Sequence, residues 1–276
     1  MTIRFLSDSA HNTAALTVTS EAMPIANTQG GRRAFVWRST DTAEQTISGT
    51  PAAPATANGL VMARHNLSGG ASIQLILKLG AATVYDTGTV GAGEVGAGDI
   101  IPAGTWRAGI DKYGATYNNL LEPQHFDLWF SAVTFDSYQI IITDTGNADG
   151  FLQIGQIMLG EAFEPSVNMS YGLSLEWIEQ TEHHRTDGGS LRSEGTHAAH
   201  RRMRIGLDWL DDADRSKLVT GLFSAGKRAD VYITAYPEEG GFLEIEHAFV
   251  ARRMSDLGFT HPFFNNWKIQ LTFEEA

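Results

Sequence analysis

The stretch DTGNADGFLQIGQIMLGEAFEPSVNMSYG, residues 144–172, contains the end of one β-rich unit and the start of another. Residues 144–150 contain two Asp, two Gly, one Thr and one Asn. These residue types favour tight turns, because Gly accepts positive φ and Asx side chains bond their own backbone. The apolar run that follows, with Phe151, Ile154 and Leu159, predicts a mostly buried strand. Pro165 ends the strand pairing, because proline has no N–H to donate, and the chain then restarts in a new direction.

This boundary divides the chain into two predicted domains, residues 1–160 and 161–276. The total of 276 residues is long enough for two ordinary domains, each with a substantial core. The connection between them is short and contains Pro165. We therefore expect the two domains to hold a nearly fixed relation to each other.

Residues 1–160 are predicted to form a jelly-roll β-sandwich. Residues 72–79, SIQLILKL, alternate Ile73, Leu75 and Leu77 with less apolar positions, as in a strand with one fully buried face. About eight short strands separated by turn residues, without the helices of a βαβ rhythm, are typical of such a fold. Residues 27–33 are predicted as a loop, and the two prolines of residues 50–59 make a helix there unlikely.

Residues 161–276 are predicted to form a second β-rich domain with one α-helix near residues 211–226. Asp211 is a suitable N-cap, and Asp212 and Asp214 in the first turn lie at the positive end of the helix dipole. Gly226 ends the helix. A glycine-rich loop is expected at residues 186–195. The predicted strands are residues 173–177, 200–210, 229–236, 242–250, 252–257 and 267–273. The predicted fold class is therefore mainly β.

Composition excludes several classes of function. With 32 acidic and 20 basic residues, the net charge is -12, which opposes the Lys/Arg-driven binding that holds proteins to nucleic acid. The chain has no cysteine, so disulfides and thiolate metal sites contribute nothing. Its first residues contain no apolar signal region, and no apolar run reaches the ~18 residues of a membrane span. We expect a chain made in the cytosol, without membrane insertion.

No catalytic constellation is recognisable. There is no G-x-S-x-G elbow and no Ser-His-Asp or Cys-His arrangement, so we predict that the chain is not an enzyme. Gly91, Gly93 and Gly96 match G-x-G-x-x-G, but no helical period follows to meet a pyrophosphate, and no cofactor is expected. The paired carboxylates occur at caps, turns or the chain end, where charge is simply solvated.

Histidines and turn carboxylates are the candidate metal ligands. His183, His184, His197 and His200 flank a glycine-rich segment, but their spacing fixes no tetrahedron, so solvated loops or subunit contacts are the competing interpretation. The turn 144–150 resembles a calcium loop, yet it lacks the bidentate Glu of an EF-hand. A turn held by Asx bonds is the favoured interpretation. No metal site is predicted.

Two sets of side chains are candidate contact surfaces. Arg201, Arg202 and Arg204 form a basic cluster in an acidic chain. Either they are outward charges that protect an edge strand, or they form a subunit contact in which guanidinium forks meet acidic surface of the next copy. A second set, in a loop-rich segment, is a candidate platform for stacking on a glycan: Trp106, Tyr113 and Tyr117.

The last strand of the first domain carries a resemblance. Asp149, Gly150, Phe151 and Leu152, followed by Ile154, Gly155 and Ile157, match a D-G-[YF]-[IL]-x-[IL]-G-x-[IL] pattern. With the preceding strands, it resembles the galactose-binding-like (discoidin-like) jelly roll found in tail proteins of long-tailed bacteriophages. The segment order of the second half is similar to that of virion proteins at the distal tail, beside the baseplate or tip.

The resemblance implies a structural virion protein. It implies a homo-oligomeric ring made by the second domain, which would link the tail tube to tip or receptor-binding proteins. The acidic balance suits a ring through which DNA passes without sticking. The alternative function is a carbohydrate-binding module that attaches the particle to host cell-surface polysaccharide.

Overall fold

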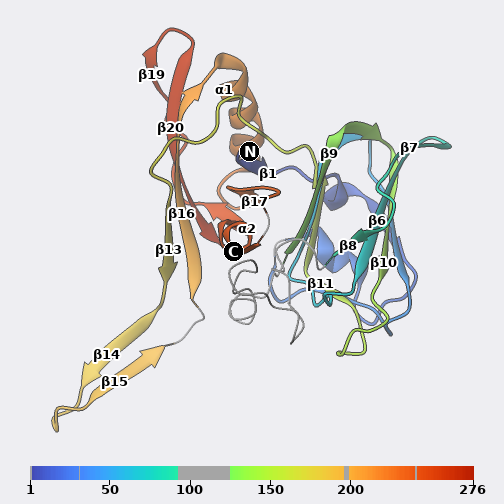
Figure 1. Ribbon diagram of the computed structural model, residues 1–276, viewed down its shortest axis with the longest axis horizontal. Helices are drawn as coiled ribbons and strands as arrows, with labels where there is room; N and C mark the ends of the chain where they lie inside the picture. The colour runs from blue at the N-terminus through green and yellow to red at the C-terminus, as the bar shows by residue number, and fades with distance from the viewer. Residues whose placement is uncertain (1, 31, 93–124, 196–198, 240) are drawn as a thin grey trace, which may run out of the picture. The chain divides into compact units, whose positions relative to one another are not determined.

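The computed structural model describes residues 2–30, 32–92, 125–195, 199–239 and 241–276. It is mainly β and separates into two compact units (Figure 1). The first unit contains residues 1–164 and 229–250, and the second contains residues 165–228 and 251–276. The chain therefore passes from one unit to the other after residues 164, 228 and 250. The first passage lies four residues beyond the domain boundary expected from the sequence.

The first unit is built on a β-sandwich, as predicted. One antiparallel sheet has the order β2-β4-β10-β6-β7, with β8 beside β6. Its strands are β2 (Ala15–Val18), β4 (Gln45–Thr50), β6 (Ser72–Leu79), β7 (Ala82–Asp86), β8 (Val90–Gly91) and β10 (Ser137–Thr143). The facing sheet has the order β12-β5-β9. Its strands are β5 (Ala55–Ala63), β9 (His125–Phe135) and β12 (Gln156–Gly160).

The core of the sandwich lies between these two sheets. Alternate residues of β6 and β10 are fully buried, as the period-2 pattern of residues 72–79 predicts. They meet apolar residues of β5 and β9 such as Leu60, Met62 and Phe126. The short strands β3 (Trp37–Arg38) and β11 (Gln153–Ile154) pair with each other beside this core. Two 3-10 helices complete the sandwich, η1 (Ala10–Thr13) and η2 (Ile25–Gln29).

The outer face of the β12-β5-β9 sheet is also covered. Val61 and Met158 point away from the sandwich core and are still 0% and 2% exposed. Strand β1 (Arg4–Leu6) pairs with β17 (Asp230–Thr234), which neighbours β18 (Ala248–Arg253), and α2 (Gly241–His247) precedes β18. Tyr232 of β17 contacts the rings of His125 and Trp129 on this outer face. The first unit therefore has a third layer outside the sandwich.

The second unit contains the other strands of this sheet. From the last residues of β18 the order continues β20-β16-β13, with β19 on β20. These strands are β13 (Ser174–Ile178), β16 (His200–Leu210), β19 (Thr260–Phe263) and β20 (Asn266–Glu275). The remaining pair, β14 (Thr181–Arg185) and β15 (Leu191–Gly195), forms a separate hairpin. It projects beyond the ends of β13 and β16 (Figure 1).

The predicted helix is confirmed. Helix α1 (Asp212–Leu218) continues through a π-helical turn, η3 (Val219–Phe223). The backbone N–H of Asp214 donates to the Asp211 carboxylate at 2.7 Å, which is the expected N-cap. Gly226, with φ 76°, follows the helix end.

Four local predictions are corrected. Residues 242–250 begin with α2 rather than a strand: the Glu244 carboxylate accepts a hydrogen bond from the backbone of Glu238, and the helix buries Glu244 and Ile245. The predicted strand 252–257 is only the end of β18, which stops at Arg253. Part of the predicted 27–33 loop is η2, and the 186–195 loop is the turn and second strand of a hairpin.

Candidate functional site

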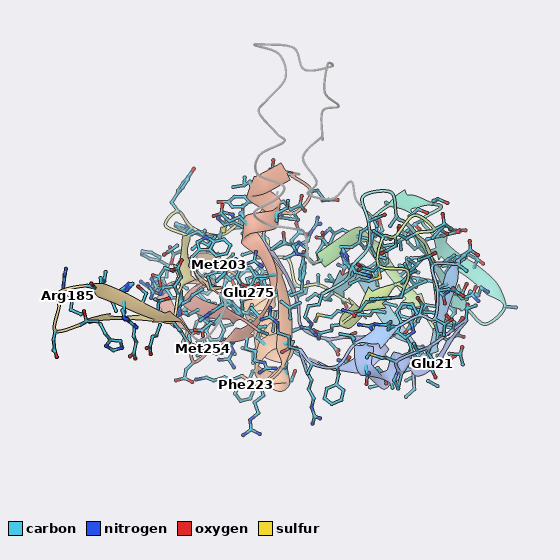
Figure 2. The ribbon with its side chains drawn as sticks, turned by 90° about the horizontal axis from the view of Figure 1, so that it is seen from below. Glu21, Arg185, Met203, Phe223, Met254 and Glu275 are labelled. Atoms are coloured by element: carbon cyan, nitrogen blue, oxygen red, sulfur yellow. The ribbon has the colours of Figure 1, made fainter. Side chains whose placement is uncertain are left out.

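The β14–β15 hairpin has no core of its own. Every residue of both strands is exposed. Figure 2 shows Arg185 at the far end of this hairpin, well away from Met203, which is buried in β16. A lone two-stranded hairpin is at best marginally stable in water. A second surface that covers the hairpin would therefore stabilise it.

The two faces of the hairpin differ in chemistry. One face carries Thr181, His183 and Arg185 opposite Gly195, Ser193 and Leu191, and it is mostly uncharged. Leu191 is 58% exposed there. The other face places Glu182 directly opposite Glu194, a like-charge pair that destabilises an isolated hairpin. His184 Nε2 lies 3.5 Å from Glu182 Oε2. The hairpin thus presents one face with the apolar Leu191 and the cation Arg185, and another on which the Glu182–Glu194 pair lies beside His184 and Arg192.

Two of the candidate histidine ligands contact other side chains of the protein. His183 Nδ1 lies 2.8 Å from Ser193 Oγ, and His200 Nε2 lies 3.2 Å from Glu274 Oε1. His197 lies outside the described residues. Within the described parts of the chain, no group of three or more His, Asp and Glu side chains could hold a metal ion.

The three candidate interface arginines have carboxylate partners in their own chain. Those partners are Glu275 for Arg201 at 2.6 Å, Glu274 for Arg202 at 2.8 Å, and Glu176 for Arg204 at 2.7 Å. The sequence does not reveal these pairs, because the partners lie on neighbouring strands far away in the chain. The Arg204 side chain is still 53% exposed and the Arg201 side chain only 11%. The assignment to a subunit interface stays a prediction, with Arg204 the best placed of the three.

Exposed aromatic side chains gather at the β19–β20 turn of the second unit. Phe263 is 68% and Phe264 97% exposed, and Asn265 between the strands has φ 51°. The carboxamide of Asn265 accepts a hydrogen bond from the backbone of Asp212 at 3.3 Å, which holds the turn beside the start of α1. The sequence pattern does not mark this turn as a contact surface.

The turn 144–150 has the Asx-bonded form favoured by its sequence. Asp144 accepts hydrogen bonds from the backbone and hydroxyl of Ser68 at 2.8 and 2.5 Å, and from the amide of Asn147 at 2.9 Å. Asn66 donates to Asp149 at 2.8 Å. Both Asp144 carboxylate oxygens thus accept from protein donors, and the network joins this turn to the loop after β5.

The aromatic residues predicted to contact a glycan, Trp106, Tyr113 and Tyr117, lie outside the described residues. A guanidinium and a ring do meet elsewhere on the sandwich. Arg38 lies over the Phe151 ring, 4.1 Å from its centroid, and donates to Gln153 Oε1 at 2.8 Å. Because β3 and β11 come together only on folding, sequence reasoning missed this pair.

A network of three polar side chains, His11, Thr28 and Tyr138, is buried inside the sandwich. Thr28 Oγ donates to a backbone carbonyl at 2.7 Å, so it accepts from His11 Nε2–H at 2.8 Å. The other ring nitrogen, Nδ1, then accepts from the Tyr138 hydroxyl at 2.6 Å. Burial lowers the pKa of His11 to about 3 and raises the pKa of Tyr138. This closed network positions no group toward solvent, so we assign it to stability.

None of the helices in the described part of the chain is long and apolar enough to cross a membrane.

Comparison with known proteins gives structural neighbours only. No family model matches the chain, and no curated protein matches it. Among solved structures, it is similar to a family 32 carbohydrate-binding module from Clostridium perfringens NanJ in complex with galactose, with 12% identity over 56% of this chain and 98% of that one and a TM-score of 0.35. It is also similar to the lectin domain of lectinolysin complexed with Lewis B antigen, with 8% identity, 56% and 96% coverage and a TM-score of 0.37. SpGH29 matches with 10% identity and a TM-score of 0.38, over 56% of this chain but only 28% of its own.

Proposed function

We propose that this chain is a structural subunit of a bacteriophage tail, placed at the distal tail or tip, which assembles into a symmetric ring and carries its sandwich as an accessory module. The observation that carries the proposal is the β14–β15 hairpin, whose strands are exposed along their whole length. Such an arm is stable when another copy covers it. The sequence resemblance to distal tail proteins implies that the particle is a phage tail. It also implies that the partners are further tail and tip proteins.

The second unit offers a surface that complements the hairpin. The outward side of β16 and β20 carries Arg202 and Arg204, and Met254 beside them is 51% exposed. These side chains line an open depression of about 310 Å³. In the proposed ring, the Glu182–Glu194 pair of one copy meets these arginines of the next. Such a contact joins two different surfaces, and it closes into a ring when its rotation divides a full turn.

Charge reversal on the hairpin tests the ring. We expect Glu182→Lys with Glu194→Lys to shift the protein from a ring-sized oligomer to a monomer, because lysines would then face the arginines of the next copy. The measurement is sedimentation velocity of the full chain, with cryo-EM of particles to locate it in the tail. The β14–β15 hairpin is a separate sheet, so the folded content seen by circular dichroism should not change.

The matched control is Glu21→Gln with Asp149→Asn, which removes two carboxylates of the sandwich and should leave the oligomer intact. An unchanged oligomer in the lysine variant would contradict the proposed contact. Absence of the chain from purified virions would contradict the tail assignment itself. If the parent chain is a monomer in solution, the same two variants are compared for incorporation into tails.

A second candidate function is carbohydrate binding by the sandwich. The observation that favours it is the Arg38–Phe151 pair with Gln153 beside it, because an aromatic ring flanked by guanidinium and amide groups is a usual way to hold a sugar. The neighbouring module from NanJ is described in complex with galactose. We propose galactose-containing polysaccharide of the host surface as the ligand class.

Two ring variants test this second function. Phe151→Ala should lower binding on a glycan array at least tenfold if the described pair holds the sugar, whereas a Trp106→Ala, Tyr113→Ala double variant should do so if the 106–117 segment holds it. Phe35→Ala removes another exposed ring of the sandwich and is the control. A parent protein that binds no glycan on the array would rule out carbohydrate binding.

A further inference from the structure

The outward face of β16 and β20 continues beyond the depression lined by Arg202 and Arg204. A second open depression, of about 400 Å³, lies on the same face. Residues of β16, β19, β20 and the segment before β19 line it, among them Asp208, Asp256, Thr260, Lys268 and Gln270. The cross-strand pair between the two depressions is Gly206 and Gln270, and Gly206 has no side chain to separate them. The two depressions form one trough along these strands, the β16–β20 trough.

Opposite charges lie at the far end of this trough. Lys268 of β20 lines it beside Thr260, its cross-strand neighbour on β19, and Asp208 of β16 lines it too. Asp256 at the border is paired with Lys227 at 2.6 Å. In the described part of the chain, neither Lys268 nor Asp208 forms an ion pair. The far end therefore offers one cation and one anion to a second molecule.

The β14–β15 hairpin carries a matching series of charges. It begins with Glu182 opposite Glu194. Two residues nearer the turn, on the same face, Arg192 is exposed, and Asp187 is exposed in the turn itself. Among the residues that the structure describes, Arg192 and Asp187 have no ion-pair partner. From its base to its turn, the hairpin thus presents two carboxylates, one cation and one carboxylate.

The spacing of charges on the hairpin agrees with the spacing in the trough. Asp187 is five positions beyond Glu182, which is at most about 17 Å at the rise of a β-strand. Lys268 is four and six positions from Thr272 and Glu274, the β20 residues opposite the two arginines, or about 14–20 Å. A hairpin with its carboxylate pair on those arginines therefore brings its turn to Lys268. The reverse direction would carry the turn beyond the end of β20, away from both depressions.

We propose that the hairpin of one copy lies lengthwise in the β16–β20 trough of the next copy, with Asp187 paired to Lys268 and Arg192 paired to Asp208. This inference rests on the proposed ring and adds the direction and register of its contact. The arginine end alone leaves the direction of the hairpin open. A second set of opposite charges, about 17 Å away along the strands, fixes it and excludes a hairpin that has slipped along the trough.

Charge reversal at the far end of the trough tests this register. Lys268→Glu and Asp187→Lys should each weaken assembly of the full chain about tenfold, because like charges then face each other across the contact. The variant that carries both changes should assemble as the parent does. An equal mixture of the two single variants should also recover assembly, because each hairpin meets an opposite charge in the trough of the other variant. The measurement is sedimentation velocity over a range of concentrations.

The matched control is Lys217→Glu, which makes the same change of charge on exposed surface of α1 and should leave assembly unchanged. If the free chain is monomeric, the same variants are compared for incorporation into tails. Single variants that lose assembly without recovery in the double variant or the mixture would overturn the proposed pairs.

The ring and this register can fail separately. If lysines at 182 and 194 abolish assembly while Lys268→Glu assembles as the parent does, the ring stands and the register is wrong. A parent chain that is monomeric in solution and absent from purified tails would overturn both.

Discussion

Alanine in place of Gly160 should prevent stable folding of the first unit. Gly160 ends β12, paired with Gly59 of β5. A Cβ built at this position overlaps the backbone carbonyl oxygen of Asp8 and lies 3.4 Å from Leu6 Cδ1. An overlapping side chain could rotate away, but this carbonyl moves only if the backbone between β1 and η1 moves with it. We expect a loss of about 3 kcal/mol or more, a large part of the usual 5–15 kcal/mol stability of a domain.

Thermal unfolding measures this effect, and Gly146→Ala is its control. Gly146 lies in the 144–150 turn, where an added Cβ meets no atom within 4 Å and the backbone is not in the left-handed region. Its melting temperature should stay within a few degrees of the parent. A Gly160→Ala protein that melts with the parent would show that the N-terminal segment is not held against β12 in solution.

The largest pH effect on stability should come from His11. Its folded pKa is about 3, whereas the unfolded ring has its ordinary value of 6.5. As the pH falls below 6.5, the unfolded chain takes up a proton that the buried ring refuses. The stability due to the neutral ring is therefore complete above pH 6.5 and declines below it, by about 1.4 kcal/mol per pH unit.

The measurement is the difference in unfolding free energy between the parent and His11→Gln, from urea titrations at several pH values. This difference isolates His11 from His65, whose pKa burial lowers to about 4, and from Asp127, which acts in the opposite sense over the same range. It should decrease by about 1.4 kcal/mol per unit as the pH is lowered from 6 to 4. Asn12→Gln, which changes an exposed residue without an ionisable group, should give a difference that is constant with pH.

Local patterns predicted the parts of the fold whose burial repeats along the chain. The alternation of residues 72–79 placed β6 correctly, and Asp211 with its acidic first turn located α1, because both signals come from neighbours in sequence. Local sequence patterns failed where contacts between residues far apart in the chain determine the secondary structure. Glu244 lies in a helix, where its carboxylate accepts a hydrogen bond from the Glu238 backbone, and residues 181–195 form a hairpin in which no alternation marks a buried face.

The same distinction between local signals and long-range contacts applies to the candidate surfaces. The basic cluster at residues 201–204 was visible in the sequence, but its in-chain partners Glu176, Glu274 and Glu275 were not. The His11–Tyr138 bond joins residues 127 positions apart, so a single sequence gives no sign of it. By contrast, the Asx turn at residues 144–150 was predicted because its residue types encode it locally, although its bonds to Ser68 and Asn66 were not.

The three passages of the chain between the two units bear on how such a protein can change in evolution. A recombination event at one point in the gene exchanges everything downstream of it. Here, a new sandwich acquired by a crossover near codon 164 would arrive without the segment 229–250, which forms part of its outer layer. The two units can therefore diverge residue by residue, but neither can be replaced from another gene in one step. We expect natural chimaeras of this protein to join at 164, 228 and 250 together, or to keep the two units together.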